Sequence, residues 1–211
     1  MYIPSLFDDL ENPDKDLKND SSKLKFNSAL LEAKNCKKCQ LSLTRNNVVF
    51  GEGPTNPEIM VIGEGPGEME DLQGIPFVGK AGQLLTKIFE SVDLKREDIY
   101  ITNVVKCRPP GNRNPLPEEV EACRHFLQVQ IESLKPKIIV LLGAVACKAI
   151  LKNFSSITKM RGELILQDDQ CFIPMFHPSY LLRNASKKEG SPRWLTWKDM
   201  QKVKKFVEKE S

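Results

Sequence analysis

Residues 58–71 read EIMVIGEGPGEMED, and this stretch decides the expected fold. Its first half is a continuous apolar run that ends in glycine, which is typical of a strand buried on both faces of a parallel sheet. Its second half carries three glycines spaced two apart, a pattern that permits a tight turn and close approach of the backbone to a ligand. Four carboxylates crowd the same turn. The stretch therefore predicts a buried parallel strand that leads into an acidic, glycine-rich loop.

The charge and spacing of this loop disfavour phosphate as its ligand. Each carboxylate near a diphosphate would repel it by about 1 kcal/mol or more. Pro66 also removes one backbone N–H that a phosphate cradle would use. The third glycine of the dinucleotide fingerprint is missing, and no Lys-Ser/Thr pair follows the loop. Close approach to a flat, neutral ring remains compatible with the sequence.

Strand and helix patterns alternate along the rest of the chain. The predicted strands are 58–63, 99–105, 137–142 and 171–176. The predicted helices are 80–92, 117–134, 143–152 and about 195–209. Asn27 or Ser28 could also cap a short helix that leads into Cys36 and Cys39. This alternation predicts an α/β fold with three αβα layers, in which helices cover both faces of a central, mostly parallel, four-stranded sheet. The segment 157–168 is expected to add a short hairpin or an edge strand.

The two ends of the chain differ from its middle. Residues 1–26 carry six acids and four lysines and few apolar groups, so we expect a flexible extension before a single domain over 27–211. Within this extension, IPSLF at 3–7 resembles short motifs that dock on bacterial sliding clamps. From Arg183 onward there are nine Lys and Arg residues and four acids. This basic arm suits a phosphate backbone, although a solvated helix face has the same composition.

The sequence contains no run of about 18 apolar residues that would span a membrane. Its first residues lack the layout of a secretory signal, so we expect a cytoplasmic, monomeric protein in a bacterial or archaeal cytosol. Stable disulfides are rare there, so the six cysteines are expected to be metal ligands, redox groups or core residues. Cys36-x2-Cys39 and Cys107-x15-Cys123 supply four thiols from two segments. Their spacing leaves a zinc ion and an iron–sulfur cluster both open.

Three predicted strands are followed by polar groups at their carboxyl ends, where open α/β sheets bind ligands. The first leads into the glycine loop, the second ends near Asn103, and the last is followed by His177. Alone, Asn103 could satisfy backbone groups and His177 could cap a turn. Three such features at corresponding positions predict one shared pocket.

Four motifs occur in order: GEGPGEMED, GIPFVGKAGQLL, TNVVKCRPPGNRNPLPEE and FHPSYLLRN. With the four cysteines, they make residues 30–205 resemble the family 4 uracil-DNA glycosylases, the iron–sulfur members of the uracil-DNA glycosylase superfamily. The resemblance implies a monofunctional hydrolase of base excision repair. Such an enzyme flips uracil out of DNA, hydrolyses its N-glycosidic bond, releases free uracil and leaves an abasic site.

The resemblance also implies roles for individual residues. It implies a [4Fe-4S] cluster with ligands Cys36, Cys39, Cys107 and Cys123, and a uracil pocket lined by Glu64, Gly65, Pro66, Phe77, Asn103 and His177. In that pocket, Phe77 stacks on the flipped base, Asn103 reads its polar edge, and His177 donates to uracil O2. The expected DNA contacts are Arg108 and Arg113, on the loop between two cysteines, and Ser179, Tyr180, Leu182 and Arg183, on a loop that enters the minor groove.

One position departs from the best-known uracil glycosylases, which carry a water-activating aspartate where this chain has Gly65. Glu64 and Glu70 are the candidate replacements, and Glu70 could instead block the 5-methyl group of thymine. Two other functions stay open from the residues: a non-catalytic iron–sulfur module for DNA binding or electron transfer, and a zinc-stabilised nucleotide-binding protein.

Overall fold

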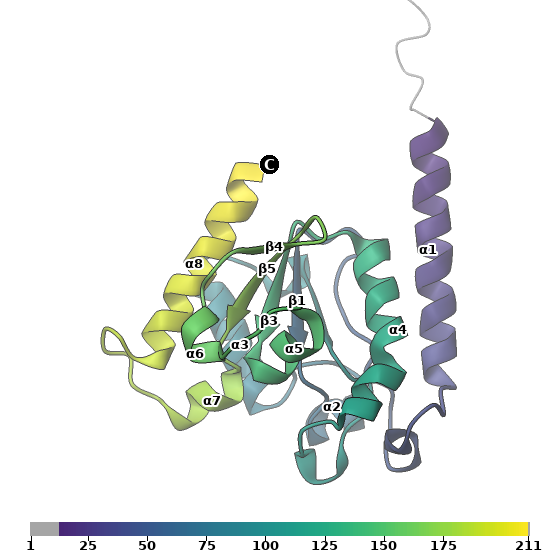
Figure 1. Ribbon diagram of the computed structural model, residues 1–211, viewed down its shortest axis with the longest axis horizontal. Helices are drawn as coiled ribbons and strands as arrows, with labels where there is room; N and C mark the ends of the chain where they lie inside the picture. Colours follow the sequence, from purple (N-terminus) through teal and green to yellow (C-terminus); the bar gives the residue numbers. More distant parts are fainter. Residues whose placement is uncertain (1–12, 211) are drawn as a thin grey trace, which may run out of the picture.

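A twisted central sheet lies between two layers of helices in the computed structural model of the chain (Figure 1). The structure describes residues 13–210, so the clamp-like segment at 3–7 lies outside the described part. The strands are β1 (Ile59–Gly63), β2 (Ile99–Asn103), β3 (Ile138–Leu142), β4 (Ile165–Gln167) and β5 (Gln170–Met175). The α-helices are α1 (Pro13–Lys34), α2 (Glu68–Gln73), α3 (Lys80–Glu90), α4 (Pro117–Leu134), α5 (Gly143–Ile150), α6 (Ile157–Met160), α7 (Pro178–Arg183) and α8 (Pro192–Glu210).

The sheet has five strands in the order β2-β1-β3-β5-β4, so the prediction of four strands is wrong by one. The first four are parallel, as predicted. The fifth, β4, comes from the segment expected to give a hairpin or edge strand, and it pairs antiparallel with β5. Asp168 and Asp169 both adopt positive φ (50° and 62°), which closes the tight turn between the two strands. The predicted α/β class and mostly parallel sheet are confirmed.

Alternate residues of the buried strands face the two helical layers. Met60 and Ile62 of β1 belong to the core shared with α1, α4 and α5. Ile59 and Val61 belong to the core shared with α3 and α8. All five residues of β1 are buried, which is why its sequence is continuously apolar instead of alternating.

Helix α1 begins at Pro13, so the part of the expected flexible extension that lies between residues 13 and 26 is helical, whereas residues 1–12 lie outside the described part. Its buried and half-buried apolar residues, Phe26, Ala29, Leu30 and Ala33, recur at helical spacing, whereas Leu24 and Leu31 are exposed. Ala29 and Ala33 are buried, and Phe26 packs edge-on against Phe50 at 5.5 Å. Helix α1 lies alongside α4 (Figure 1), and this packing stabilises a helix that is longer than the short one expected from Asn27 or Ser28.

Helix α8 lies on the other side of the sheet from α1 (Figure 1). It starts at Pro192, three residues before the predicted start. Asp199 is fully buried on this helix and accepts a hydrogen bond from Arg161 Nε at 2.8 Å. A paired, buried carboxylate of this kind fixes the helix against the loop before β4.

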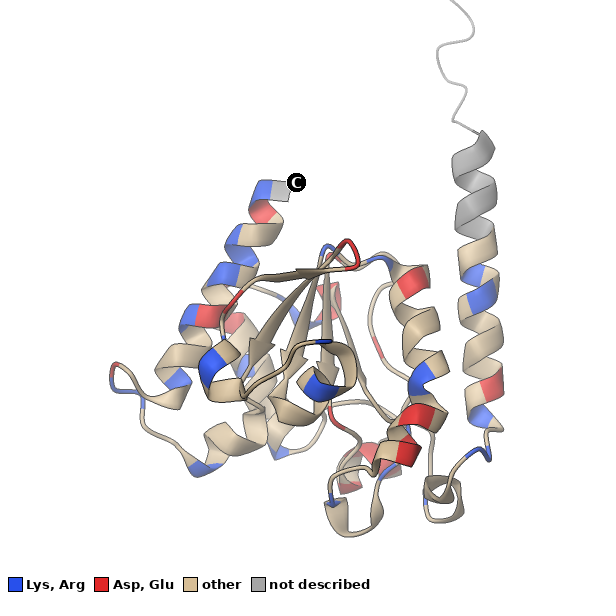
Figure 2. Cartoon of the chain, viewed as in Figure 1, with Lys and Arg blue, Asp and Glu red and all other residues tan. Residues whose placement is uncertain are grey.

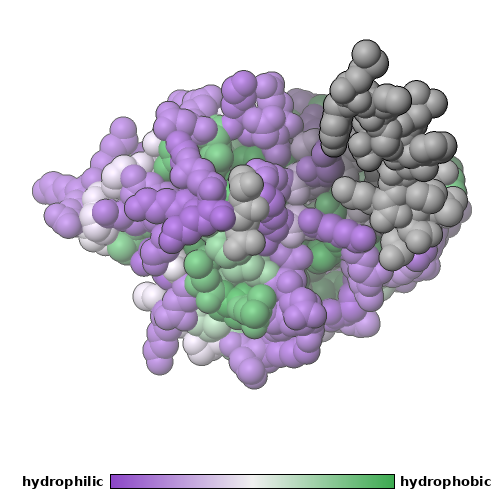
Figure 3. Space-filling model, turned by 90° about the horizontal axis from the view of Figure 1, so that it is seen from above, coloured by the Kyte–Doolittle hydropathy of each residue, from purple (hydrophilic) through white to green (hydrophobic). Residues whose placement is uncertain are grey.

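The carboxyl ends of the parallel strands and the short helices α2 and α7 lie at one end of the molecule, the lower end in Figure 1. The opposite end is seen in Figure 3, where hydrophilic side chains cover most of the described surface. Between residues 13 and 210, no helix combines the length and the apolar character needed to cross a bilayer.

Candidate active site

A cleft of about 730 Å³ opens at the carboxyl ends of the parallel strands. Of the residues predicted to form the site, those lining the cleft are Glu64, Gly65, Pro66, Glu70, Phe77, Asn103, Arg113, His177, Ser179, Tyr180 and Arg183. Sequence reasoning missed the opposite wall, formed by Gly143, Ala144 and Val145 at the start of α5 and by Ile157 and Thr158 of α6. The end of β3 at Gly143 was the one available signal for that wall.

Asn103, the last residue of β2, presents an unpaired acceptor to the cleft. Its side chain is 1 % exposed, and its Oδ1 is the one buried side-chain oxygen or nitrogen without a hydrogen-bond partner in the described chain. Leaving such an acceptor unpaired costs about 1–3 kcal/mol. The atom is therefore suited to a ligand that brings its own N–H or O–H donor.

Gly63, the last residue of β1, leaves the space in which Asn103 and Phe77 meet. A Cβ atom at Gly63 would lie 2.5 Å from Asn103 Oδ1 and 2.5 Å from Phe77 Cζ, both well inside contact distance. The register pairs Gly63 with Asn103 directly across β1 and β2. Glycine is thus required at this strand end by close packing of the two site side chains.

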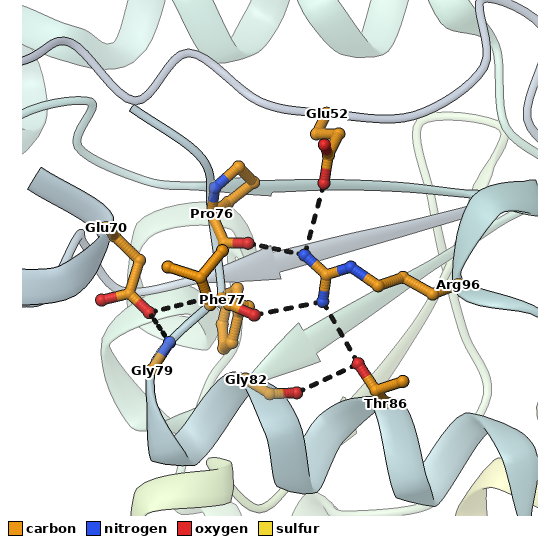
Figure 4. A network of polar contacts seen from close by, with 9 residues as sticks. Glu52, Glu70, Pro76, Phe77, Gly79, Gly82, Thr86 and Arg96 are labelled. Atoms are coloured by element: carbon orange, nitrogen blue, oxygen red, sulfur yellow. Dashed lines mark hydrogen bonds and ion pairs between the residues drawn. The ribbon is translucent and has the colours of Figure 1, made fainter. Parts of the chain in front are cut away.

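Phe77 is held in an unusual backbone conformation, with φ at 52°. Arg96 donates to the carbonyl oxygens of Pro76 at 2.6 Å and of Phe77 at 3.2 Å, and it also pairs with Glu52 (Figure 4). The Phe77 ring lies 5.9 Å from the His177 ring. A strained φ of this kind costs about 1–3 kcal/mol, and the Arg96 contacts offset part of it. Sequence reasoning missed Arg96, which lies 19 residues away on a polar connection with no recognisable motif.

Three of the four carboxylates of the glycine loop are engaged in holding the loop. Glu70 accepts hydrogen bonds from the N–H groups of Gly67 (3.1 Å), Val78 (2.9 Å) and Gly79 (2.8 Å), two of which are drawn in Figure 4. Asp71 is buried and accepts from the backbone N–H of Asn46 at 2.9 Å. The third, Glu68, is exposed and pairs with Arg108 at 3.7 Å.

The fourth carboxylate, Glu64, has no partner within residues 13–210 and faces the cleft half-buried. Burial raises its pKa above the usual value, because the ionised form is poorly solvated there. Two carboxylates that sequence alone could not separate thus differ in structure. Glu70 is occupied by three backbone donors, whereas Glu64 has free oxygens.

His177 lies at the N-cap of α7 and is half-buried. The backbone N–H of Ser179 donates to its Nδ1 at 3.2 Å, and Ser179 Oγ lies 2.8 Å from the same atom. Because Nδ1 accepts, the ring proton of the neutral form must lie on Nε2. Burial first, and then the nearby Arg183 charge, lower the pKa of His177 to about 4. The ring is therefore a neutral Nε2–H donor at physiological pH.

The four predicted cluster cysteines lie together around a small cavity that shares no residue with the cleft. Cys36, Cys39, Cys107 and Cys123 all line it. Arg45 Nη1 donates to Cys107 Sγ at 3.2 Å, and the backbone N–H of Lys106 donates to Cys123 Sγ at 3.3 Å. In the described residues, no three His, Cys, Asp or Glu side chains gather around the place of a single metal ion. The cavity instead presents four thiols from separate positions, with N–H donors directed at two sulfurs.

Lys106 joins this cysteine cavity to the cleft. Its side chain is buried, and Nζ donates to the Asn103 carbonyl oxygen at 2.7 Å and to Gln130 Oε1 at 2.6 Å. The residue next to a predicted cluster ligand thereby supports the strand end that carries Asn103. Its position in the sequence alone gave no sign of this contact.

The predicted DNA contacts fall into two groups. Arg113 forms two hydrogen bonds with the buried Glu119, at 2.7 and 2.8 Å, so its charge is already paired. On α7, Tyr180 and Arg183 line the cleft, whereas Leu182 faces a neighbouring groove. The structure thus places three of the four predicted contacts of α7, Ser179, Tyr180 and Arg183, at the cleft, and Leu182 outside it.

The tautomer of His177 can be measured directly. We expect nitrogen-resolved NMR to find its ring neutral, with the proton on Nε2, at pH 8 and still at pH 6, and to find it charged only near its lowered pKa of about 4, because burial disfavours the imidazolium ion. The chain has two histidines, and the exposed ring of His125 is the internal comparison. A His177 ring that becomes positively charged near pH 6.5, the ordinary value, would contradict this description.

Comparison with known proteins identifies the family. The family model described as the uracil DNA glycosylase superfamily matches residues 50–201. A type-4 uracil-DNA glycosylase of Thermotoga maritima is 51 % identical over 84 % of this chain and 92 % of its own length. Others from Archaeoglobus fulgidus and Sulfurisphaera tokodaii are 43 % and 46 % identical, each over 75 % of this chain and over 83 % and 76 % of their own lengths. The chain therefore belongs to the uracil DNA glycosylase superfamily, as a member of its type-4 group.

Proposed function

We propose that the protein excises uracil from DNA by hydrolysing the N-glycosidic bond, which releases free uracil and leaves an abasic site. The observation that carries the proposal is the unpaired, buried Oδ1 of Asn103, in a cleft that the Phe77 ring and the neutral His177 donor also line. Membership of the type-4 group supports the same reaction. A base inside a duplex cannot reach this cleft, so the nucleotide must first flip out, at a cost of a few kcal/mol.

The hydrogen-bonding pattern of Asn103 selects uracil over cytosine. Its Oδ1 accepts from uracil N3–H, and its amide N–H donates to O4. Cytosine presents an acceptor at N3 and a donor at the exocyclic position, so both buried groups of Asn103 would be opposed by like groups. A site built around such pairs rejects the mismatched base strongly. Stacking on Phe77 contributes about 1–3 kcal/mol and does not discriminate between bases.

Bond cleavage places negative charge on uracil O2 and positive charge on the sugar. The Nε2–H of His177 stabilises the developing oxyanion, an effect worth about 3–4 kcal/mol in comparable sites. Glu64, with its free carboxylate, orients the water that adds to C1′ and stabilises the cationic sugar. The water proton passes to solvent through this carboxylate, and the uracil anion leaves and is protonated by solvent. Glu70 acts indirectly, because its three hydrogen bonds hold the glycine loop in place.

The four cysteines fit the [4Fe-4S] cluster that we propose as the cofactor. They line one cavity, and the N–H groups of Arg45 and Lys106 point at two sulfurs, as donors do in iron–sulfur sites. The cluster would supply a structural cross-link, because Cys107 and Cys123 bracket the loop that carries Arg108 and Arg113. Through Lys106, the same cross-link supports Asn103.

The proposal extends to the location, the oligomeric state and the partners of the enzyme. We propose that the enzyme is a cytoplasmic monomer that acts on uracil in single- or double-stranded DNA. Residues 3–7 are proposed to dock on a sliding clamp, on the strength of their motif. Residues of α7 at the rim, among them Tyr180 and Arg183, are proposed to meet the DNA minor groove.

Removing the side chain of either Asn103 or His177 should abolish most of the uracil-releasing activity without unfolding the protein. We expect Asn103→Ala and His177→Ala each to lower the rate of uracil release by about 10²–10³-fold, because each removes an interaction made in the transition state. The measurement is single-turnover release of uracil from an oligonucleotide. The exposed Asn153→Ala variant is the matched control and should keep the wild-type rate. Near-wild-type release by both site variants would refute the assigned pocket.

The role of Glu64 predicts a specific pH dependence. Since burial raises its pKa, the carboxylate takes up a proton at a higher pH than usual, and the rate should fall as pH drops through that raised pKa. A raised pKa means that the folded state favours the protonated form of Glu64. Protonation of Glu64 therefore does not unfold the protein, and the fall in rate at low pH has another cause, the loss of the carboxylate that orients the water.

We expect Glu64→Gln to be slow and to lack this acidic fall in rate. Glu68→Gln, at an exposed position of the same loop, is the control and should keep both the rate and its pH dependence. The profile of the single-turnover rate between pH 4.5 and 8 checks both variants. If the rate of Glu64→Gln fell at low pH as the wild-type rate does, another group would have to orient the water.

The cluster can be tested by colour and composition. Anaerobically purified protein should be brown and contain iron and sulfide, and Cys123→Ser should lose most of both and melt at a lower temperature. Cys147→Ala is the control and should retain the iron, because Cys147 is a core residue that does not line the cavity. A colourless wild-type protein with one zinc ion per chain would contradict the cofactor.

A further inference from the structure

A second hollow, a groove of about 680 Å³, lies between α3, α7 and α8. We name it the tryptophan groove. Its walls are Lys80, Gln83, Leu84, Lys87, Ile88 and Ser91 of α3 and the turn after it, Leu181 and Leu182 of α7, and Lys187, Arg193, Trp194 and Trp197 of α8 and the loop before it. None of these residues takes part in the reaction proposed above.

The charge of the tryptophan groove is uniformly positive. Four cations line it and no Asp or Glu does. In the described part of the chain, none of the four forms an ion pair with a carboxylate. Arg193 Nε donates instead to the Leu181 carbonyl oxygen at 3.0 Å. Many of the blue residues in Figure 2 lie on α8 and the loop before it. The groove is therefore ready for an anionic ligand, since no acid of its own has to be displaced.

Aromatic surface lies beside these cations. Trp194 and Trp197 are both partly exposed in the groove, and they are the only two tryptophans of the chain. Lys198 Nζ lies 5.3 Å and 5.6 Å from the centres of these two rings. Trp197 is fixed from behind, because its Nε1–H donates to the Ser91 carbonyl oxygen at 3.4 Å. Cations that follow a backbone, together with exposed rings on which bases stack, are the two features of sites for unpaired nucleic acid.

The tryptophan groove and the active-site cleft share a wall. On α3, Ala81 lines the cleft and its neighbour Lys80 lines the groove. On α7, Tyr180 lines the cleft and Leu182 lines the groove. A strand with one nucleotide in the cleft therefore has only to cross α7 to enter the groove.

We infer that the tryptophan groove binds an unpaired stretch of the same DNA strand, holding the nucleotides that flank the flipped uracil on one side. The inference deepens the proposed function and rests on it for the nucleotide in the cleft. An acidic peptide would meet the same cations, but the paired tryptophans and the shared wall with the cleft favour nucleic acid.

The two tryptophans make the inference directly measurable. A single-stranded oligonucleotide without uracil should quench the intrinsic tryptophan fluorescence, because its bases stack on the only tryptophans present. A duplex of the same sequence should quench it less, since its bases are already stacked on one another. A poly-glutamate peptide of equal charge should leave the fluorescence nearly unchanged.

Two lysines at the mouth of the groove provide the variant. Lys87→Gln with Lys187→Gln should weaken binding of the single strand and reduce the slope of log affinity against log salt by about 1.4, at about 0.7 per lost phosphate contact. The matched control is Lys23→Gln with Lys25→Gln on α1, across the sheet from the groove, which should bind like the wild type. Circular dichroism confirms that both variants are folded.

The outcomes separate this inference from the proposed function. If the protein releases uracil but single strands leave its tryptophan fluorescence unchanged, the groove is not a DNA site and the active site stands. Equal quenching by wild type and the Lys87/Lys187 variant, or equal quenching by poly-glutamate, would also overturn the inference. Quenching by single strands without any uracil release would support the groove and refute the proposed reaction.

Discussion

The space left by the missing side chain of Gly63 is the constraint on which the active site depends. At the carboxyl end of β1, Asn103 arrives from β2 and Phe77 from the loop before α3, and a single Cβ atom at Gly63 would collide with both. Their closeness lets one flat ligand stack on a ring while an amide reads its edge. The strained φ of Phe77 and the unpaired Oδ1 of Asn103 are costs that the free protein bears for this arrangement.

The four carboxylates of the glycine loop have different contacts, and these contacts explain why the loop is so acidic. Glu70 and Asp71 accept hydrogen bonds from backbone N–H groups, and the exposed Glu68 pairs with Arg108. Their charges stabilise the loop and the first turn of α2, where negative charge is favourable. Only Glu64 is left free in the cleft, which suits a reaction that develops positive charge on a sugar. The same loop would be ill suited to a phosphate.

Much of this architecture could be predicted from sequence, for identifiable physical reasons. Strands such as β1 and β3 are buried on both faces, so their continuous apolar runs marked them clearly. Helix α4 was predicted with its observed bounds, because proline at its first turn and its apolar periodicity agree. Only the last part of helix α1 is predicted, as a short helix from Asn27 or Ser28, because its earlier residues are polar and charged. Strand β4 is only three residues long, so the sequence indicates no more than a hairpin or an edge strand.

The site residues also divide into those that the sequence predicts and those that it does not. Asn103 and His177 lie next to strand ends, so topology alone brought them together. The roles of Arg96, Arg45 and Lys106 could not be predicted, because each acts through contacts that depend on the folded path of distant segments. The separation of Glu64 from Glu70 likewise required hydrogen-bond geometry. Sequence patterns identify residues that face a shared edge, whereas their supporting contacts emerge only in three dimensions.

The proposed cleft releases uracil and discriminates it from cytosine by hydrogen bonding. The most direct measurement incubates the wild-type protein with single-stranded oligonucleotides that differ only in one base, uracil or cytosine, and quantifies both free base and abasic sites. We predict free uracil and abasic sites in equal amounts from the first oligonucleotide and no release from the second. DNA binding without base release, or release of cytosine as fast as uracil, would contradict it.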